Sequence, residues 1–159
     1  MPDRVAGVDT QQIILSLLRE DLSDDAIRRL NALAEGEWAE VIRAARAQGL
    51  APVLSGSIQR LHIDAPKVTQ AQLREALLNN TARNLQVLKH FGVLAGALQA
   101  QGLPFVPLKG VYLCSNVYEN LGERTLWDVD LLVPAAELER ALGLIETTGY
   151  RSSRPYDLK

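Results

Sequence analysis

The feature that most limits the fold of this chain is a long apolar stripe in its middle. After the polar break IDAPKV, Thr69 can cap a helix, and apolar side chains then recur every three or four positions to about residue 100. Such spacing places side chains on one helix face, so it predicts one long helix with a buried stripe. The stripe comprises Leu73, Leu77, Thr81, Leu85, Leu88, Phe91, Ala95 and Leu98.

The chain before this helix, residues 1–66, is predicted to be a helical N-terminal region. Its helical patterns are short: Ser23 caps the second and Gly36 ends it, Gly49 ends the third, and Pro52 lies in the first turn of a fourth. Residues 1–66 are therefore expected to form a small helical bundle.

Residues 67–159 combine the long helix with alternating strand and helix patterns. LPFVPLKG and RTLWDVDLLV are typical of strands, and VYLCSNVYENLG and PAAELERALGLIETTGY are typical of helices. Residues 150–159 are compatible with a further strand. The alternation predicts a small mixed sheet with packed helices, so the whole chain is expected to be an α+β protein.

Composition and charge narrow the class of protein. Of the 159 residues, 47% are apolar and 23% are charged, which is the balance of a folded globular chain. The formal net charge is −2 and Lys and Arg form no run, so extended nucleic acid is disfavoured as a partner. Cys114 is the sole cysteine, and no apolar stretch approaches the roughly 20 residues of a membrane span. A cytoplasmic protein without a membrane partner is expected.

Two aspartates separated by one residue lie in the second predicted strand. Side chains alternate along a strand, so Trp127 and every second residue to Val133 should face the core. Asp128 and Asp130 should then share the other face with Cα atoms about 6–7 Å apart. Aspartate is unfavourable in strands, and this spacing suits one divalent cation or a close pair of them. The alternative is an edge strand with two solvated aspartates.

The end of the first predicted strand carries a second motif. Gly110 lies where a helix begins, and backbone N–H groups at a helix start can bind phosphate. Lys109 beside it adds a positive charge for a phosphate oxygen. The alternative is a turn glycine and a solvated lysine. Together with the aspartates, the motif predicts a phosphate-binding turn that faces a metal-ligand pair.

The order LKG, a short helix with Tyr118, GERTLWDVDLLV, and a helix closing with GY resembles the uncharacterised nucleotidyltransferase family. This family is a branch of the DNA polymerase β-like nucleotidyltransferase superfamily, and the resemblance spans about residues 84–150. It implies a nucleotidyltransferase-like sheet in which Asp128 and Asp130 are the catalytic ligands of Mg²⁺ (or Mn²⁺). It also implies transfer of a nucleoside monophosphate from a nucleoside triphosphate to an acceptor that the sequence does not identify. Lys109, Gly110 and Arg124 match nucleotide- or phosphate-binding positions.

The sequence departs from the family pattern in two places. The wider superfamily has a second small residue after the turn glycine, where this chain has Val111. A third carboxylate on a later strand normally completes the metal site, and Asp157 is the only acidic candidate after Glu146. Family members are usually longer, which implies that this chain is the N-terminal portion of one.

Three alternatives stay open at this level. The fold could serve as a catalytically inactive binding or assembly module, or the D-x-D pair could bind the metal of a nucleotide sugar in a glycosyltransferase. Arg124 could form a salt bridge with Asp128 or Glu123 that orders the loop, instead of binding phosphate.

Overall fold

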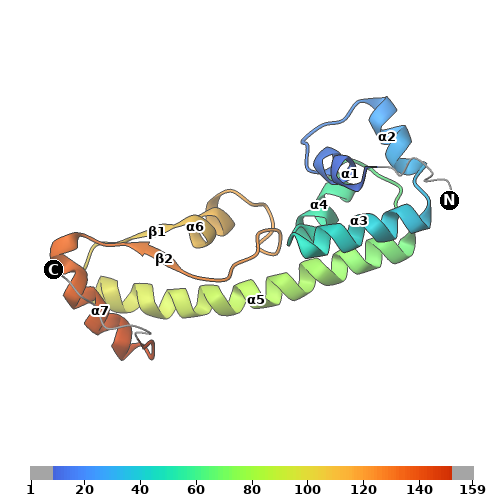
Figure 1. Cartoon of the computed structure of the whole chain (residues 1–159). Helices are drawn as coiled ribbons and strands as arrows, with labels where there is room; N and C mark the ends of the chain where they lie inside the picture. The colour runs from blue at the N-terminus through green and yellow to red at the C-terminus, as the bar shows by residue number, and fades with distance from the viewer. Residues whose placement is uncertain (1–8, 152–159) are drawn as a thin grey trace, which may run out of the picture.

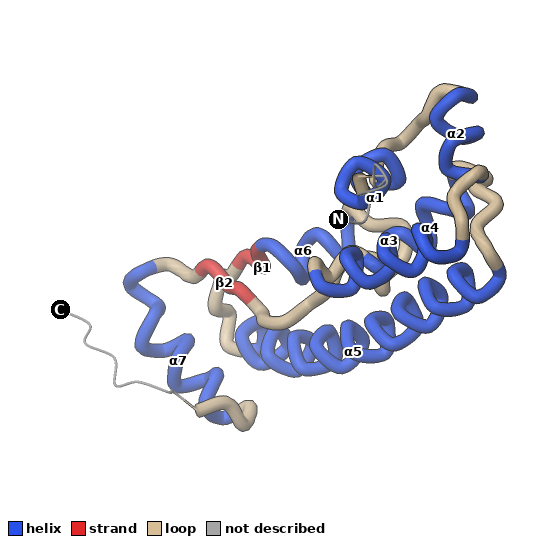
Figure 2. Tube along the Cα trace, turned by 45° about the vertical axis from the view of Figure 1, so that its right-hand side comes forward, coloured by secondary structure: helices blue, strands red, loops and turns tan. Residues whose placement is uncertain are grey.

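The computed structural model describes residues 9–151 and is organised around one long helix (Figure 1). Helix α5 (Lys67–Ala100) has 34 residues and is therefore about 50 Å long. Helices α3 and α4 lie along its first half, with α1 and α2 on their outer side, and β1, β2, α6 and α7 lie over its second half (Figures 1 and 2). The molecule is thus elongated, with two lobes that share a single helix.

The N-terminal lobe is the predicted helical bundle. Pro52 lies in the first turn of α4, as expected, and Gly49 follows α3 in a left-handed conformation with φ of 71°. Gly36 was expected to end the second helix, but it lies in the first turn of α3 because α2 already ends at Asn31. The four helices are α1 (Thr10–Leu17), α2 (Asp24–Asn31), α3 (Glu35–Ala47) and α4 (Ala51–Arg60).

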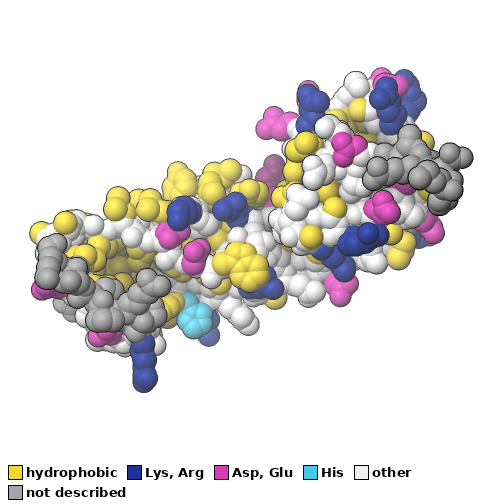
Figure 3. All heavy atoms as spheres, in the orientation of Figure 1, with side chains coloured by type: hydrophobic (Ala, Val, Ile, Leu, Met, Phe, Trp, Pro, Cys, Tyr) yellow, Lys and Arg dark blue, Asp and Glu magenta, His cyan; other side chains and the backbone are white. Residues whose placement is uncertain are grey.

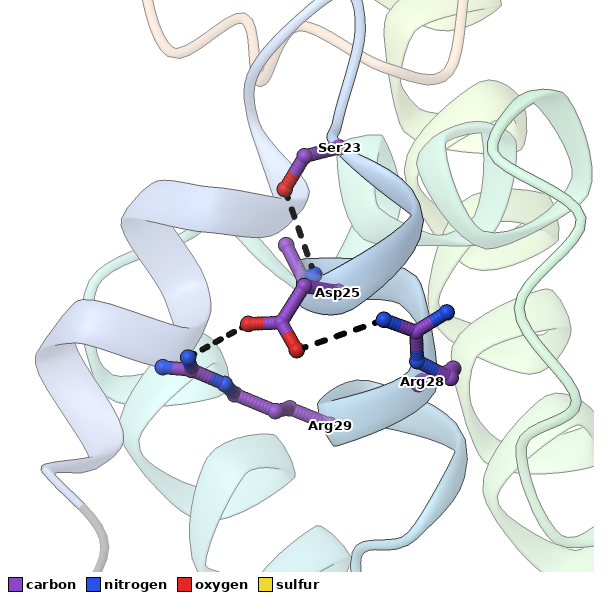
Figure 4. Close-up of polar contacts among 5 residues, drawn as sticks. Ser23, Asp25, Arg28 and Arg29 are labelled. Carbon is purple, nitrogen blue, oxygen red and sulfur yellow. Dashed lines mark hydrogen bonds and ion pairs between the residues drawn. The ribbon is translucent and has the colours of Figure 1, made fainter.

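Helix α2 shows how local polar contacts start these short helices. The Ser23 hydroxyl accepts a hydrogen bond from the backbone N–H of Ala26, which caps the helix (Figure 4). Asp25 in the first turn forms ion pairs with Arg28 at 3.5 Å and with Arg29. These ion pairs are on the surface and contribute little to the stability of the protein, so the fold of this lobe depends on its apolar core. Its largest fully buried side chains are Leu17, Trp38, Leu54 and Leu73.

The C-terminal lobe confirms the α+β class. Strands β1 (Val106–Leu108) and β2 (Asp130–Leu132) pair antiparallel, with Leu108 opposite Asp130, and in residues 9–151 the sheet has these two strands. Leu94 and Leu98 of α5 pack with Leu103 and Ala141 beneath the sheet. The helices of this lobe are α6 (Lys109–Asn116), the 3₁₀ turn η1 (Ala135–Glu137) and α7 (Leu138–Thr147). The strand considered for 150–159 lies largely outside the described residues.

The second predicted strand is much shorter than expected. Only Asp130–Leu132 is strand, so Asp128 lies in the preceding loop and does not share a strand face with Asp130. Trp127 was expected in the core, but its side chain is 77% exposed, and Leu126 is buried instead. Leu131 and Val133 do pack on the core, as predicted. In the register that pairs Leu108 with Asp130, Val129 and Asp128 would lie opposite Lys109 and Gly110. Those two residues already belong to α6, so the ladder ends at Asp130.

The apolar stripe on α5 is also interrupted. The helix begins at Lys67, so Thr69 is a buried residue inside it and not its cap. Leu85 of the predicted stripe is 52% exposed, whereas Asn80 and Asn84 are buried. These asparagines face the loop that crosses α5 between α6 and β2, whose carbonyl groups need donors. No helix within residues 9–151 is both long enough and apolar enough to cross a membrane.

Candidate functional site

Strand pairing brings the two predicted motifs together. Leu108 ends β1 opposite Asp130, the first residue of β2, and Lys109 follows directly as the first residue of α6. The Lys109 Nζ atom lies 2.9 Å from Oδ2 of Asp130. Lys109 also has a positive φ of 45°, which is uncommon for a residue with a side chain and is typical of functional turns. The register of two short strands therefore sets the geometry of the site.

Asp130 pairs with Lys109, and Asp128 adds a weaker electrostatic effect. The hydrogen bond to Asp130 raises the pKa of Lys109, followed by the charge of Asp130 and, more weakly, the charge of Asp128. The side chains of Lys109 and Asp130 are 71% and 32% exposed, so the ion pair is accessible to solvent. Either side chain can therefore exchange its partner for another ion or for water at little cost. One carboxylate thus contacts a replaceable positive charge, and the second affects it only through its own charge.

Gly110 is required by close packing. A Cβ atom at this position would lie 2.6 Å from Cδ2 of Leu126, a buried side chain in the loop before β2. The start of α6 therefore lies directly against the loop that leads to Asp128. Val111, which replaces the second small residue of the superfamily, is buried and faces away from solvent.

Two asparagines of α5 fix the loop before β2. The fully buried Asn84 donates from Nδ2 to the carbonyl oxygens of Leu121 and of Arg124, the latter at 2.6 Å, and its Oδ1 accepts from the Leu126 N–H at 3.1 Å. Asn80, one turn earlier, donates to the Gly122 carbonyl oxygen at 2.6 Å. We call these two residues the asparagine clamp.

Sequence reasoning assigned no role to the asparagine clamp. The available signal was a pair of amides four residues apart within the longest helical pattern of the chain. Buried amides need partners, so such a pair indicates that irregular backbone crosses the helix there. The clamp holds the loop that ends at Asp128 and Asp130.

Arg124 lies beside α6, and its backbone is part of the clamped loop. Its Nε atom is buried and has no hydrogen-bond partner among residues 9–151. Burial raises the pKa of the Cys114 thiol, and the nearby Arg124 charge opposes that rise. Among the described residues, Arg124 does not form the salt bridge considered with Asp128 or Glu123. The ion pair at the site joins Lys109 and Asp130. A phosphate role for Arg124 stays a prediction.

The donor set fits a hard divalent cation in part. Asp128 and Asp130 supply carboxylate oxygens, which Mg²⁺ and Mn²⁺ prefer, and Asp130 already contacts a cationic side chain. Residues 9–151 contain no group of three His, Cys, Asp or Glu side chains that could hold a metal ion, and Asp157 lies outside the described residues. Mg²⁺ is commonly bound by one or two carboxylates together with substrate phosphates, so this pair suits a metal that arrives with a nucleotide.

Comparison with known proteins identifies the family. No curated protein and no solved structure matches the chain. The family described as "Uncharacterised nucleotidyltransferase" matches residues 34–158. The matched range begins well before the expected 84–150, and it includes Lys109, Gly110, Asp128 and Asp130. The chain therefore belongs to the uncharacterised nucleotidyltransferase family, and a general nucleotidyltransferase role follows from that membership.

Proposed function

We propose that the protein transfers a nucleoside monophosphate from a nucleoside triphosphate to an acceptor hydroxyl in a metal-dependent reaction. The observation that carries this proposal is the Lys109–Asp130 ion pair at the junction of β1 and α6, with Asp128 two residues before Asp130. Family membership supports the nucleotidyl group as the transferred unit. Metal dependence and the site residues are our inference.

Each residue of the site has a role that its position supports. Asp128 and Asp130 would hold Mg²⁺ or Mn²⁺, which when bound neutralises the triphosphate charge and activates the attacking hydroxyl. The exposed Lys109 ammonium can leave Asp130 and meet a phosphate oxygen. The first backbone N–H groups of α6, next to Gly110, have no partners within the helix and can bind a second phosphate oxygen. Arg124 would add positive charge beside them.

Calorimetry of nucleoside triphosphate binding with and without Mg²⁺ tests this proposal. We expect binding that needs Mg²⁺ and falls about tenfold or more when Asp128→Asn and Asp130→Asn are combined. Asp21→Asn is the matched control, because Asp21 is an exposed acid in the loop between α1 and α2. Equal binding by the double variant and the control would refute the assignment of these aspartates.

A second candidate function is a nucleotide-binding or assembly module without catalysis. It is favoured by the two-carboxylate set found in residues 9–151, since a third ligand normally completes the catalytic site. The discriminating measurement is product formation: bound nucleotide without release of pyrophosphate, across a broad set of acceptors, would favour the module. Family membership favours nucleotidyl transfer over the glycosyltransferase alternative.

A further inference from the structure

An open apolar cavity of about 620 Å³ lies directly beside Asp128. One face of α5, one face of α7 and the segment 127–133 form its walls, and the surface of this half of the molecule is hollowed and rich in hydrophobic side chains (Figure 3). The volume is within the range of small-molecule sites, roughly 300–1,000 Å³. The apolar wall residues are Val87, Leu94, Val129, Leu131, Val133, Leu138, Ala141, Leu142 and Ile145.

The polar groups of the cavity are few, and their charge is informative. Gln86, His90 and Tyr150 contribute groups that can hydrogen-bond, and among residues 9–151 Asp128 is the one acidic side chain in the wall. No Lys or Arg of this described part of the chain lines the cavity. An anionic occupant would therefore lose its hydration against a largely apolar wall without a cationic partner among the described lining residues, whereas a neutral occupant would not.

Trp127 gives the cavity an aromatic rim. Its indole is largely exposed, and the Arg83 guanidinium carbon lies 4.6 Å from the ring centroid, at a distance typical of cation–π contacts. Arg83 and Trp127 both line a second pocket. Of these two residues, Trp127 also lines the apolar cavity and Arg83 does not. The ring is thus held on one side by Arg83 and borders the apolar cavity next to Asp128.

We infer that this cavity binds the acceptor, and that the acceptor is a small hydroxyl compound with an apolar body and no anionic group. The inference rests on the proposed function and names its second substrate class. With the body in the cavity, the hydroxyl is presented at Asp128, where the nucleotide site begins. The acceptor oxygen forms a bond to the α-phosphorus while the bond to the bridging oxygen breaks. Pyrophosphate leaves with the electron pair, and the hydroxyl proton passes to solvent water.

The test uses the full chain and two probes that differ in charge. Binding of 2-naphthol, a neutral aromatic alcohol, is compared with binding of 2-naphthalenesulfonate by equilibrium dialysis, and we expect the sulfonate to bind about tenfold more weakly or worse. Val87→Trp fills the cavity and should weaken 2-naphthol binding about tenfold. Val93→Trp is the matched control, since Val93 is on the same helix but exposed and outside the cavity. Leu142→Gln, on the α7 wall, repeats the test should Val87→Trp fail to fold.

Nucleotide binding, measured on the same proteins, separates this inference from the proposed function. Mg²⁺-dependent nucleotide binding should survive Val87→Trp, and nucleotide and 2-naphthol should bind together without competition. The acceptor cavity alone would be overturned if nucleotide binding is intact but 2-naphthol does not bind. The same conclusion would follow if Val87→Trp leaves 2-naphthol binding unchanged. Competition between the two ligands would also overturn it, because the nucleotide would then occupy the cavity. Binding of 2-naphthol without any nucleotide binding would overturn both the proposed function and the acceptor role.

Discussion

The asparagine clamp gives the most demanding prediction, the replacement Asn84→Leu. Leucine has a similar size but can neither donate to the carbonyl oxygens of Leu121 and Arg124 nor accept from the Leu126 N–H. At ~1 kcal/mol for each hydrogen bond, the loss is ~3 kcal/mol, and buried backbone groups left without partners raise it to ~3–5 kcal/mol. We therefore expect the free energy of unfolding to fall by that amount.

Chemical denaturation followed by circular dichroism measures this change. The matched control is Asn79→Leu, because Asn79 is on the same helix but exposed, so its replacement should change stability by no more than ~0.5 kcal/mol. Asn84→Leu should also weaken Mg²⁺-dependent nucleotide binding at temperatures where the variant stays folded, since the loop that carries Asp128 loses its support. A loss below ~1 kcal/mol at an unchanged denaturant slope would refute the reasoning that the clamp orders this loop.

The remaining predictions concern packing, charge and pH. Gly122→Ala should destabilise the protein by ~1–3 kcal/mol, because its Cβ would lie 2.7 Å from a backbone carbonyl oxygen of α5. Gly143→Ala, in open space inside α7, should instead stabilise it by ~0.5–1 kcal/mol in the same denaturation assay. Lys109→Gln should weaken triphosphate binding and reduce its salt dependence in calorimetry, while the melting temperature changes little because the Asp130 pair is exposed. Burial, followed by the charge of Glu119, raises the pKa of Glu123 above its ordinary 4.5, so the folded state disfavours the carboxylate and loses stability as pH rises through the raised value. Glu123→Gln should therefore raise the melting temperature near pH 7 and leave it unchanged near pH 3.5, and equal effects at both values would contradict this assignment.

The sequence by itself determined the elements with a strong periodic or capping signal. The long helix, the Ser23 cap, the proline at the start of α4 and the α+β class all follow from local spacing and from residues with restricted backbones. Family membership was also accessible, because the order of LKG and WDVD along the chain is itself a sequence property. These features need no knowledge of residues far away in the chain.

The tertiary structure decided how the site is assembled. Local strand preference could not show that β2 is limited to Asp130–Leu132, because its partner strand gives way to α6 at Lys109. The loop before β2 is held by Asn80 and Asn84, about 40 residues earlier in the chain. The same distant contacts bury Leu126 and leave Trp127 exposed, against the alternation expected for a strand.

The ion pair of Lys109 with Asp130 and the cavity beside Asp128 likewise exist only after distant segments meet. Periodicity reports which side of an element is buried, but a hydrogen bond or a cavity depends on the partner that the other segment supplies. The sequence therefore specified which residues are candidates for the chemistry, and the packing of the loop and strands against α5 set their positions relative to one another.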